Sequence, residues 1–136
     1  MTHIRDDAAL KQLLTGAKVI AVVGYSDKPT RPSYQIGRYL KNAGYTVYAV
    51  NPTLKEIDGE PVYATLTDVP EKIDVVDVFR RSEFLPEVVE DAIAAGAKTV
   101  WAQLGVTHDD AARRAEEAGL DIVMNRCIKV EHMRLL

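Results

Sequence analysis

The sequence has little that would direct a protein out of the cytoplasm. Its 136 residues include one cysteine, Cys127, which excludes a disulfide bond within the chain. No apolar run approaches the roughly 20 residues that span a bilayer. The N-terminal sequence MTHIRDDAALKQLL has acidic residues where a secretory signal peptide has basic and apolar regions. We therefore expect a cytoplasmic protein with no membrane partner.

The chain also lacks an excess of charge of one sign. Its 17 Lys and Arg residues and its 20 Asp and Glu residues give a net charge of −3 at pH 7. This balance produces no general field that attracts nucleic acid or an acidic membrane. We expect no nucleic-acid partner, and we expect any anionic ligand to be bound by a local site.

Common nucleotide-binding and catalytic motifs are missing as well. The sequence contains neither a G-x-G-x-x-G pattern nor a Walker loop, and its His, Cys and carboxylate residues show no recognised metal-ligand spacing. A nucleophilic Cys127 would need a base, and none of the three histidines lies in a motif that marks a cysteine partner. We expect no metal site and no catalytic residue, so the chain by itself is not expected to be an enzyme.

What the sequence does contain is an alternation of short apolar runs and amphipathic segments. Its 47% hydrophobic content and its length suit one domain with one core. Residues 19–23 form an apolar run too short for a buried helix, and the run stops at Gly24, which is typical of a parallel strand covered on both faces. Four further strands are predicted at residues 46–50, 75–79, 99–102 and 121–123.

Helices are predicted in most of the intervals between these strands. Capping residues, helical apolar spacing and terminal glycines indicate a first helix that begins at Asp6 or Asp7 and ends at Gly16, and further helices at residues 33–43, 86–95 and 109–118. Between the second and third strands, the Asp58-Gly59 pair predicts a short hairpin over residues 57–63 and little regular helix.

This alternation predicts an α/β fold, a Rossmann-like doubly wound parallel sheet with helices on both faces. Because crossovers are right-handed, few topologies remain, and we expect the five main strands, numbered along the chain, in the order 3-2-1-4-5. In such sheets the ligand binds beyond the carboxyl ends of the strands where the winding reverses, here between the first and fourth strands. We expect residues 1–136 to form one domain with its site there.

The loop after the first strand has the chemistry of an anion site. It lies between a strand and a helix, where backbone N–H groups and the helix dipole bind phosphate. Gly24 permits a tight turn, Ser26 can donate a hydrogen bond, and Lys28 and Arg31 supply positive charge. The alternative interpretation is a solvated loop in which Gly24 only ends the strand.

The second strand ends at Val50, Asn51 and Pro52, where an NAD site usually has an acidic residue. Without that carboxylate, the position tolerates a phosphorylated ribose, because a carboxylate would repel the phosphate. NADP and coenzyme A both meet this criterion. A turn forced by Pro52 explains the same residues and is compatible with a ligand contact.

Two later strand ends add candidate ligand contacts. Phe79 and Arg80 follow the third strand, and a guanidinium suits phosphate because it donates two hydrogen bonds in one plane. The alternative is that Arg80 or Arg81 pairs with Glu83. After the fourth strand, Trp101 is either a cleft residue or a core anchor, and it is followed by Gln103, Leu104 and Gly105.

These short motifs occur together and in a characteristic order: Gly24-Tyr25-Ser26, Val50-Asn51-Pro52, Val76-Asp77-Val78-Phe79-Arg80, Val100-Trp101-Ala102-Gln103-Leu104-Gly105 and Asn125-Arg126-Cys127. The chain resembles the small stand-alone CoA-binding proteins, which are similar to the N-terminal CoA-binding domain of the succinyl-CoA synthetase α subunit. The resemblance extends from about residue 19 to residue 136.

The resemblance implies a site for coenzyme A or an acyl-CoA. The loop after the first strand would cradle the phosphates, the second strand end would lie by the adenosine, and the later strand ends would line the cleft. Tyr25 stands where the family usually has a small residue, and we expect its phenol to narrow the pocket. The expected ligand-binding residues are Gly24, Tyr25, Ser26, Lys28, Arg31, Val50, Asn51, Pro52, Phe79, Arg80, Gln103, Leu104 and Gly105.

The resemblance does not imply the ligase reaction, because the synthetase's phosphorylated histidine belongs to a second domain that this chain does not have. Our leading hypothesis is a non-catalytic module that binds CoA for sensing, storage or delivery. The alternatives are an NADP-dependent or acyl-transfer enzyme, and a subunit that lends its CoA site to a separate ligase partner chain. Assembly into a homo-oligomer is left open.

Overall fold

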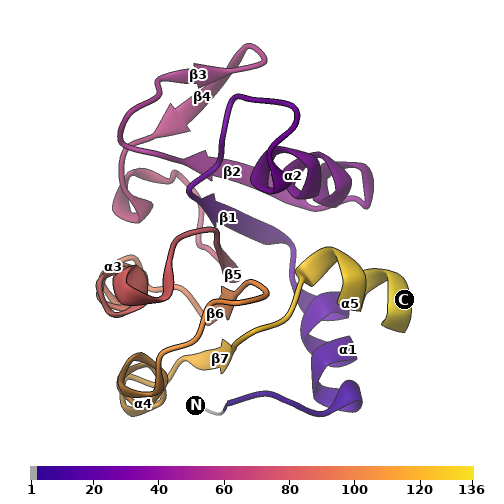
Figure 1. Ribbon diagram of the computed structural model, residues 1–136, viewed down its shortest axis with the longest axis vertical. Coiled ribbons are helices and arrows are strands. Elements are labelled where there is room, and N and C mark those ends of the chain that lie inside the picture. Colours follow the sequence, from indigo (N-terminus) through magenta and orange to yellow (C-terminus); the bar gives the residue numbers. More distant parts are fainter. Residues whose placement is uncertain (1–2) are drawn as a thin grey trace.

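A seven-stranded sheet forms the centre of the protein in a computed structural model that describes residues 3–136 (Figure 1). All neighbouring strands are parallel except β3 and β4. The strands are β1 (Val19–Val23), β2 (Thr46–Val50), β3 (Glu56–Ile57), β4 (Glu60–Tyr63), β5 (Val75–Val78), β6 (Thr99–Ala102) and β7 (Asp121–Val123). The predicted α/β class and the predicted hairpin are confirmed.

The predicted order of the five main strands is wrong. The sheet runs β3-β4-β2-β1-β5-β6-β7, so the third predicted strand, β5, lies beside β1 and not beside β2. The place next to β2 belongs to β4, the second strand of the hairpin, which pairs in parallel with Ala49 and Val50. β4 is short and contains Pro61, a residue that strands accept only at edges and bulges, so its sequence did not indicate a strand of the main sheet.

Helices cover both faces of the sheet, as predicted, with α3 and α4 on one face and α1, α2 and α5 on the other (Figure 1). They are α1 (Asp7–Gly16), α2 (Pro32–Asn42), α3 (Leu85–Ala94), α4 (Asp109–Glu117) and α5 (Ile128–Leu135), with short 3₁₀ turns η1 (Leu66–Asp68) and η2 (Ser82–Phe84). Asp6 is the N-cap of α1 and accepts a hydrogen bond from the N–H of Ala9 (2.8 Å). Within residues 3–136, none of the helices has the length and apolar character needed to cross a membrane.

Helix α5 was not among the predicted helices. Only Ile128 and Glu131 are buried on it, whereas Val130 and Met133 are exposed. Its apolar residues therefore do not mark its buried face, and a helix is recognised in a sequence by apolar residues that do.

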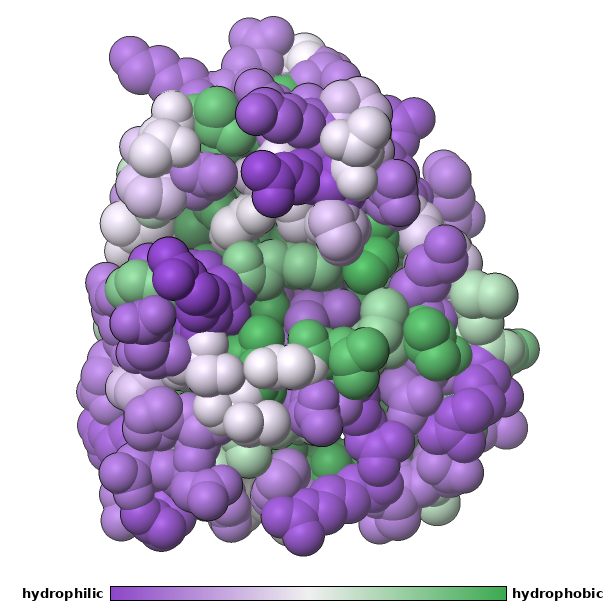
Figure 2. Space-filling view, in the orientation of Figure 1, coloured by the Kyte–Doolittle hydropathy of each residue, from purple (hydrophilic) through white to green (hydrophobic). Residues whose placement is uncertain are grey.

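Hydrophobic side chains form a band across the middle of the surface seen in Figure 2, with hydrophilic side chains above and below it.

The core contains one unexpected polar group, Asp77 on β5. It is fully buried between Val22 of β1 and Trp101 of β6, and neither carboxyl oxygen has a hydrogen-bond partner among the described residues. Burial raises the pKa of Asp77 well above its usual value of 3.8. Burial therefore favours the protonated, neutral form of this side chain in the folded protein.

This burial predicts an unusual pH dependence of stability. An unfolded Asp77 ionises above about pH 4, whereas the folded one keeps its proton, so the free energy of unfolding should fall as pH rises toward the folded pKa, by about 1.4 kcal/mol per pH unit at most. Asp77→Asn removes this titration. In urea unfolding at several pH values, the stability of the variant relative to the original chain should therefore increase with pH.

A matched control is Asp74, in the loop before the same strand. Burial alone would raise the pKa of Asp74, but the N–H groups of Val19 and Lys18 and the Lys98 ammonium lower it below its usual value. The stabilisation from Asp74 is present above pH 4 and is lost as pH falls through the lowered pKa. Asp74→Asn should therefore become relatively less stable as pH rises. Parallel profiles for the two variants would contradict our account of Asp77.

Candidate ligand-binding site

The winding of the sheet reverses between β1 and β5. After β1 the chain enters α2 on one face, and after β5 it enters α3 on the other. Ligands of such sheets bind beyond the carboxyl ends of the strands at this point. The predicted position between the first and fourth strands is therefore wrong by one strand, for the same reason as the strand order.

Two adjoining hollows lie at this edge and share Gly24, Asn51 and Phe79. The first, here called the loop hollow, has a volume of about 430 Å³ and is lined by Gly24, Ser26, Asp27, Lys28, Arg31, Pro32, Ser33, Asn51, Thr53, Leu54 and Phe79. The second, the strand-end hollow, has a volume of about 640 Å³ and is lined by Val23, Gly24, Val50, Asn51, Pro52, Ala64, Thr65, Leu66, Phe79, Arg80, Arg81, Phe84, Glu87, Val88 and Asp91. Together they form the carboxyl-edge groove.

Gly24 lies where the two halves of the groove meet. Its N–H donates to the carbonyl of Val50 (2.9 Å), and its φ of +84° is one that residues with a side chain rarely adopt. A Cβ added at this position would lie 2.6 Å from the carbonyl oxygen of Phe79. A glycine is thus needed for the loops after β1 and β5 to approach each other.

Asn51 links the loops after β1 and β2. Its side-chain N–H donates to the carbonyl of Tyr25 (3.0 Å), and its side-chain oxygen accepts from the N–H and hydroxyl of Thr53 (2.9 and 2.8 Å). The turn interpretation of Asn51 and Pro52 is therefore correct, and both residues also line the groove. The groove has no carboxylate at this position, as the sequence indicated.

Positive charge collects in the loop hollow. Lys28 and Arg31 line it, and neither forms an ion pair with any residue in the described range 3–136. Arg31 is also the N-cap of α2 and does not cap it with its side chain. The positive end of the helix dipole therefore adds to the two cations. One acidic residue, Asp27, lines the same hollow.

The serines of this loop order its main chain. The N–H of Ser26 donates to the hydroxyl oxygen of Ser33 (3.0 Å), and the N–H of Lys28 donates to the hydroxyl oxygen of Ser26 (3.1 Å). Ser33 is buried in the first turn of α2. These bonds leave the hydroxyl hydrogens of both serines available for a ligand in the loop hollow.

The strand-end hollow has a different charge. The guanidinium of Arg80 pairs with Glu87 (3.7 Å) and lies over the ring of Phe84 at 4.2 Å from its centroid. Arg81 pairs with Glu83 (3.8 Å), as the alternative interpretation proposed. Burial, and then the Glu87 carboxylate, raise the pKa of Asp91. With its cations paired and with acidic residues in its wall, this hollow suits a neutral group better than a phosphate.

Four of the expected ligand-binding residues line neither hollow. Gln103 is buried, and its side-chain oxygen accepts from the N–H of Ile128 (3.2 Å) at the start of α5. Gly105 donates its N–H to the side-chain oxygen of Asn125 (2.7 Å), and Leu104 is 71% exposed.

Trp101, which was predicted to be either a cleft residue or a core anchor, is a core anchor. Its ring is fully buried, and its N–H donates to the carbonyl of Arg126 (2.8 Å).

The fourth expected ligand-binding residue that lines neither hollow is Tyr25, and its ring does not narrow the groove. The ring lies beneath α2 and is 2% exposed. It is so close to the helix that a Cβ on Gly37 would lie 2.4 to 2.5 Å from its outer atoms. The expectation of a narrowed pocket was wrong because Gly37 provides the space for the ring on the other side of the loop.

A family model described as a CoA binding domain matches residues 18–133. The chain belongs to this family of CoA-binding domains. The domain is 41% identical over 125 residues to the uncharacterized protein YneT of Bacillus subtilis, a match that covers 92% of this chain and 93% of that protein. It is similar to the solved structure of a hypothetical protein from Pyrococcus horikoshii, with 44% identity, a TM-score of 0.92 and coverage of 96% and 92% of the two chains.

A larger relative of the domain is the ADP-forming acetate–CoA ligase I of Archaeoglobus fulgidus. The two are 30% identical over 121 residues, which are 82% of this chain but 18% of the ligase. The domain thus corresponds to a small part of that enzyme.

The groove of the domain also contains residues that the sequence did not single out. Ser33, Thr53 and Leu54 line the loop hollow, and Ala64, Thr65 and Leu66 line the strand-end hollow. The last three follow β4. Because β4 was not expected in the parallel sheet, its carboxyl end was not expected at the groove. Ser33 follows Pro32 in the first helical turn, a position that does indicate an anion site.

The close approach at Gly24 predicts a large effect of a methyl group there. Gly24→Ala combines a strained φ with overlap on the Phe79 carbonyl. Gly105 is the matched control, because it has nearly the same φ of +85° but open space around an added Cβ. We expect Gly105→Ala to cost about 1 to 2 kcal/mol of unfolding free energy and Gly24→Ala at least about 1 kcal/mol more. Urea unfolding of both variants measures this, and equal losses would contradict the steric role of Phe79.

Proposed function

We propose that this domain binds coenzyme A or an acyl-CoA in the carboxyl-edge groove as a non-catalytic module. The observation that supports this most directly is the loop hollow, where Lys28 and Arg31 lie beside the N-terminus of α2 and form no ion pair with residues 3–136. A phosphate group matches this arrangement because it accepts hydrogen bonds from ammonium, guanidinium and backbone N–H groups together.

The division of the groove into two hollows fits a ligand with a charged part and a less charged part. In our proposal the loop hollow binds phosphates of CoA. The strand-end hollow binds a neutral part, the adenine or the pantetheine arm, against Phe79, Phe84 and Leu66. Asn51 stands where NAD sites have a carboxylate, which favours a ligand with a phosphorylated ribose.

The absence of a catalytic role in this proposal rests on the positions of the histidines and of the cysteine. His108 accepts a hydrogen bond from the N–H of Ala111 at the start of α4 (3.1 Å). His132 is hydrogen-bonded to the hydroxyl of Tyr39 (2.7 Å), and His3 to the guanidinium of Arg5 (2.8 Å). None of the three lines the groove, and Cys127 does not line it either.

The proposal predicts a ranking of ligands. CoA should bind most tightly, followed by dephospho-CoA, NADP and NAD, because the groove would contact both the CoA phosphates and the pantetheine arm. A ligand present at 100 times its Kd stabilises the folded protein by about 2.7 kcal/mol. Thermal unfolding and calorimetric titration with the four compounds measure the ranking. Tighter binding of NADP than of CoA would favour an NADP-dependent protein instead.

The charges of the loop hollow should dominate the affinity. Each of Lys28→Ala and Arg31→Ala removes a cation that is free to bind phosphate, and the loss of such a bond costs about 1.5 to 3 kcal/mol, or roughly ten- to a hundred-fold in Kd for CoA. Lys11→Ala, on α1 and outside both hollows, is the matched control and should leave Kd unchanged. Calorimetric titration at two salt concentrations measures these effects. An unchanged Kd in the Lys28→Ala/Arg31→Ala double variant would place the phosphates elsewhere, near Arg80 and Arg81.

A further inference from the structure

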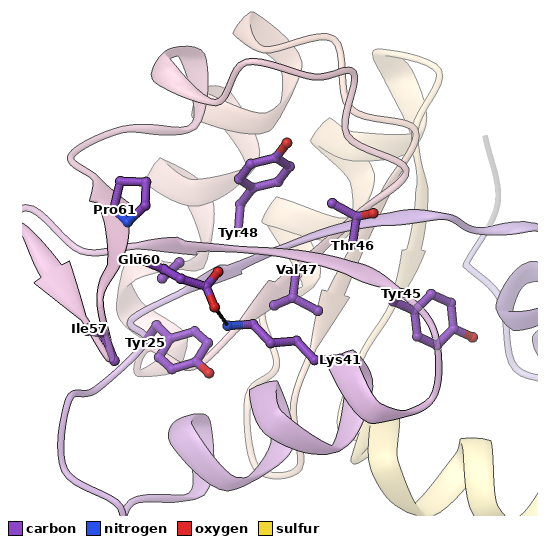
Figure 3. A pocket seen from close by; sticks show the side chains of 10 residues that line it. Tyr25, Lys41, Tyr45, Thr46, Val47, Tyr48, Ile57, Glu60 and Pro61 are labelled. Atoms are coloured by element: carbon purple, nitrogen blue, oxygen red, sulfur yellow. Dashed lines mark hydrogen bonds and ion pairs between the residues drawn. The ribbon is translucent and has the colours of Figure 1, made fainter.

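A third hollow, here called the β2 pocket, lies at the free edge of β2 and shares no lining residue with the carboxyl-edge groove. Its volume is about 370 Å³, and residues of α2, β2 and the β3–β4 hairpin line it. Figure 3 shows Thr46 and Tyr48 on one side of β2 and Val47, Lys41 and Tyr25 on the other. The pocket is therefore open to the main chain of β2 as well as to side chains.

Within residues 3–136, the main chain of β2 offers a hydrogen-bond donor here that is not paired with a neighbouring strand. Thr46 donates its N–H toward β1, to the carbonyl of Lys18 (2.9 Å), and Asn51 donates its N–H toward β4, to the carbonyl of Tyr63 (2.9 Å). By the alternation along a strand, the N–H and C=O of Val47 point to the β4 side. There β4 pairs only with Ala49 and Val50. The polar groups of Val47 thus face the pocket without a strand beside them.

Tyr25 supplies a second donor. Its side chain is 2% exposed and lines the pocket, and its hydroxyl has no hydrogen-bond partner among residues 3–136. Burial raises the pKa of Tyr25 to about 12, so the hydroxyl keeps its proton and can donate. The hydroxyl is therefore left to hydrogen-bond with a ligand or water in the pocket.

Lys41 supplies a third donor, on the same side of β2 as Tyr25 (Figure 3). Its ammonium lies 6.0 Å from the centroid of the Tyr25 ring and pairs with Glu60 at 3.2 Å. The Glu60 side chain is 61% exposed, so this ion pair is weak and Glu60 can exchange for a ligand at little cost. Ile57, Pro61 and Val47 provide apolar walls.

We propose that the β2 pocket binds a small organic acid with one carboxylate and an apolar body, and that the carboxylate accepts hydrogen bonds from the hydroxyl of Tyr25 and the ammonium of Lys41. Once Glu60 moves away, the Lys41 ammonium can pair with a single carboxylate, and one ammonium does not match a nucleotide or a polyphosphate. The volume suits a ligand of a few to about a dozen non-hydrogen atoms. This site is separate from the proposed CoA site and does not depend on it.

The test uses acid and amide pairs of the same shape. The full chain labelled with ¹⁵N is titrated with acetate, isovalerate and phenylacetate, and with the amide of each, while backbone shifts are followed by NMR. We expect saturable shifts at Lys41, Val47 and Ile57 with at least one acid, and at least about ten-fold weaker binding of the matching amide. If none of the acids shifts these residues, or if acid and amide bind equally, the proposal is wrong.

Variants identify the donors. Tyr25→Phe keeps the ring and removes the hydroxyl, and Lys41→Met keeps the apolar stem and removes the charge, so each should weaken the acid about ten-fold or more. The matched controls are Tyr34→Phe, whose hydroxyl donates to Asp58 outside the pocket (2.5 Å), and Lys11→Met on α1. Both controls should bind like the original chain. Equal losses in Tyr25→Phe and Tyr34→Phe would overturn the proposed role of the Tyr25 hydroxyl.

Discussion

The approach of the Gly24 main chain to the carbonyl of Phe79 is the contact on which the groove depends. The two residues end the central strands β1 and β5, and the strands pair in register up to Val23 and Val78. A left-handed glycine lets the chain turn away from β1 at once, without a side chain that would hold the two loops apart. Both hollows share Gly24 and Phe79. The distance between these two residues therefore determines where a ligand in the groove would contact the sheet.

Hydrogen bonds of Asn51 and Ser33 order the loops at this edge of the sheet. Asn51 ties the loop after β2 to the carbonyl of Tyr25, and Ser33 ties the start of α2 to the N–H of Ser26. The loop that contains Lys28 and Arg31 is thus held at both ends while its cations remain free of ion pairs with the described residues. A preorganised loop loses less entropy when a ligand binds, which favours affinity for a flexible, multiply charged molecule.

The sequence was a good guide wherever burial and local turn chemistry determine the structure. The apolar run of β1, the Asp6 cap and the Asp58-Gly59 turn all form as predicted. Predictions from the sequence failed where contacts between distant residues determine the structure. β4 pairs with two residues of β2, and so short a segment contains no hydrophobic pattern that would predict this pairing. The direction of the Tyr25 ring depends on Gly37, twelve residues away. Gln103 and Gly105 lie in a family motif, yet their hydrogen bonds order the segment around Asn125 and the start of α5.

Tyr25 lines the β2 pocket, and its main chain also contacts Asn51, a residue of the carboxyl-edge groove. Its carbonyl accepts from Asn51 at the carboxyl-edge groove, whereas its ring and hydroxyl face α2 and the β2 pocket. The ring packs against Tyr34 in an edge-to-face arrangement, with centroids 6.2 Å apart, and against Gly37, so it supports the same helix whose N-terminus lines the loop hollow. Removing the whole ring would leave a cavity under α2 and disturb both sites. Removing only the hydroxyl keeps this packing and the Asn51 bond, so its effect is confined to the β2 pocket, and the two sites can be separated at a single residue.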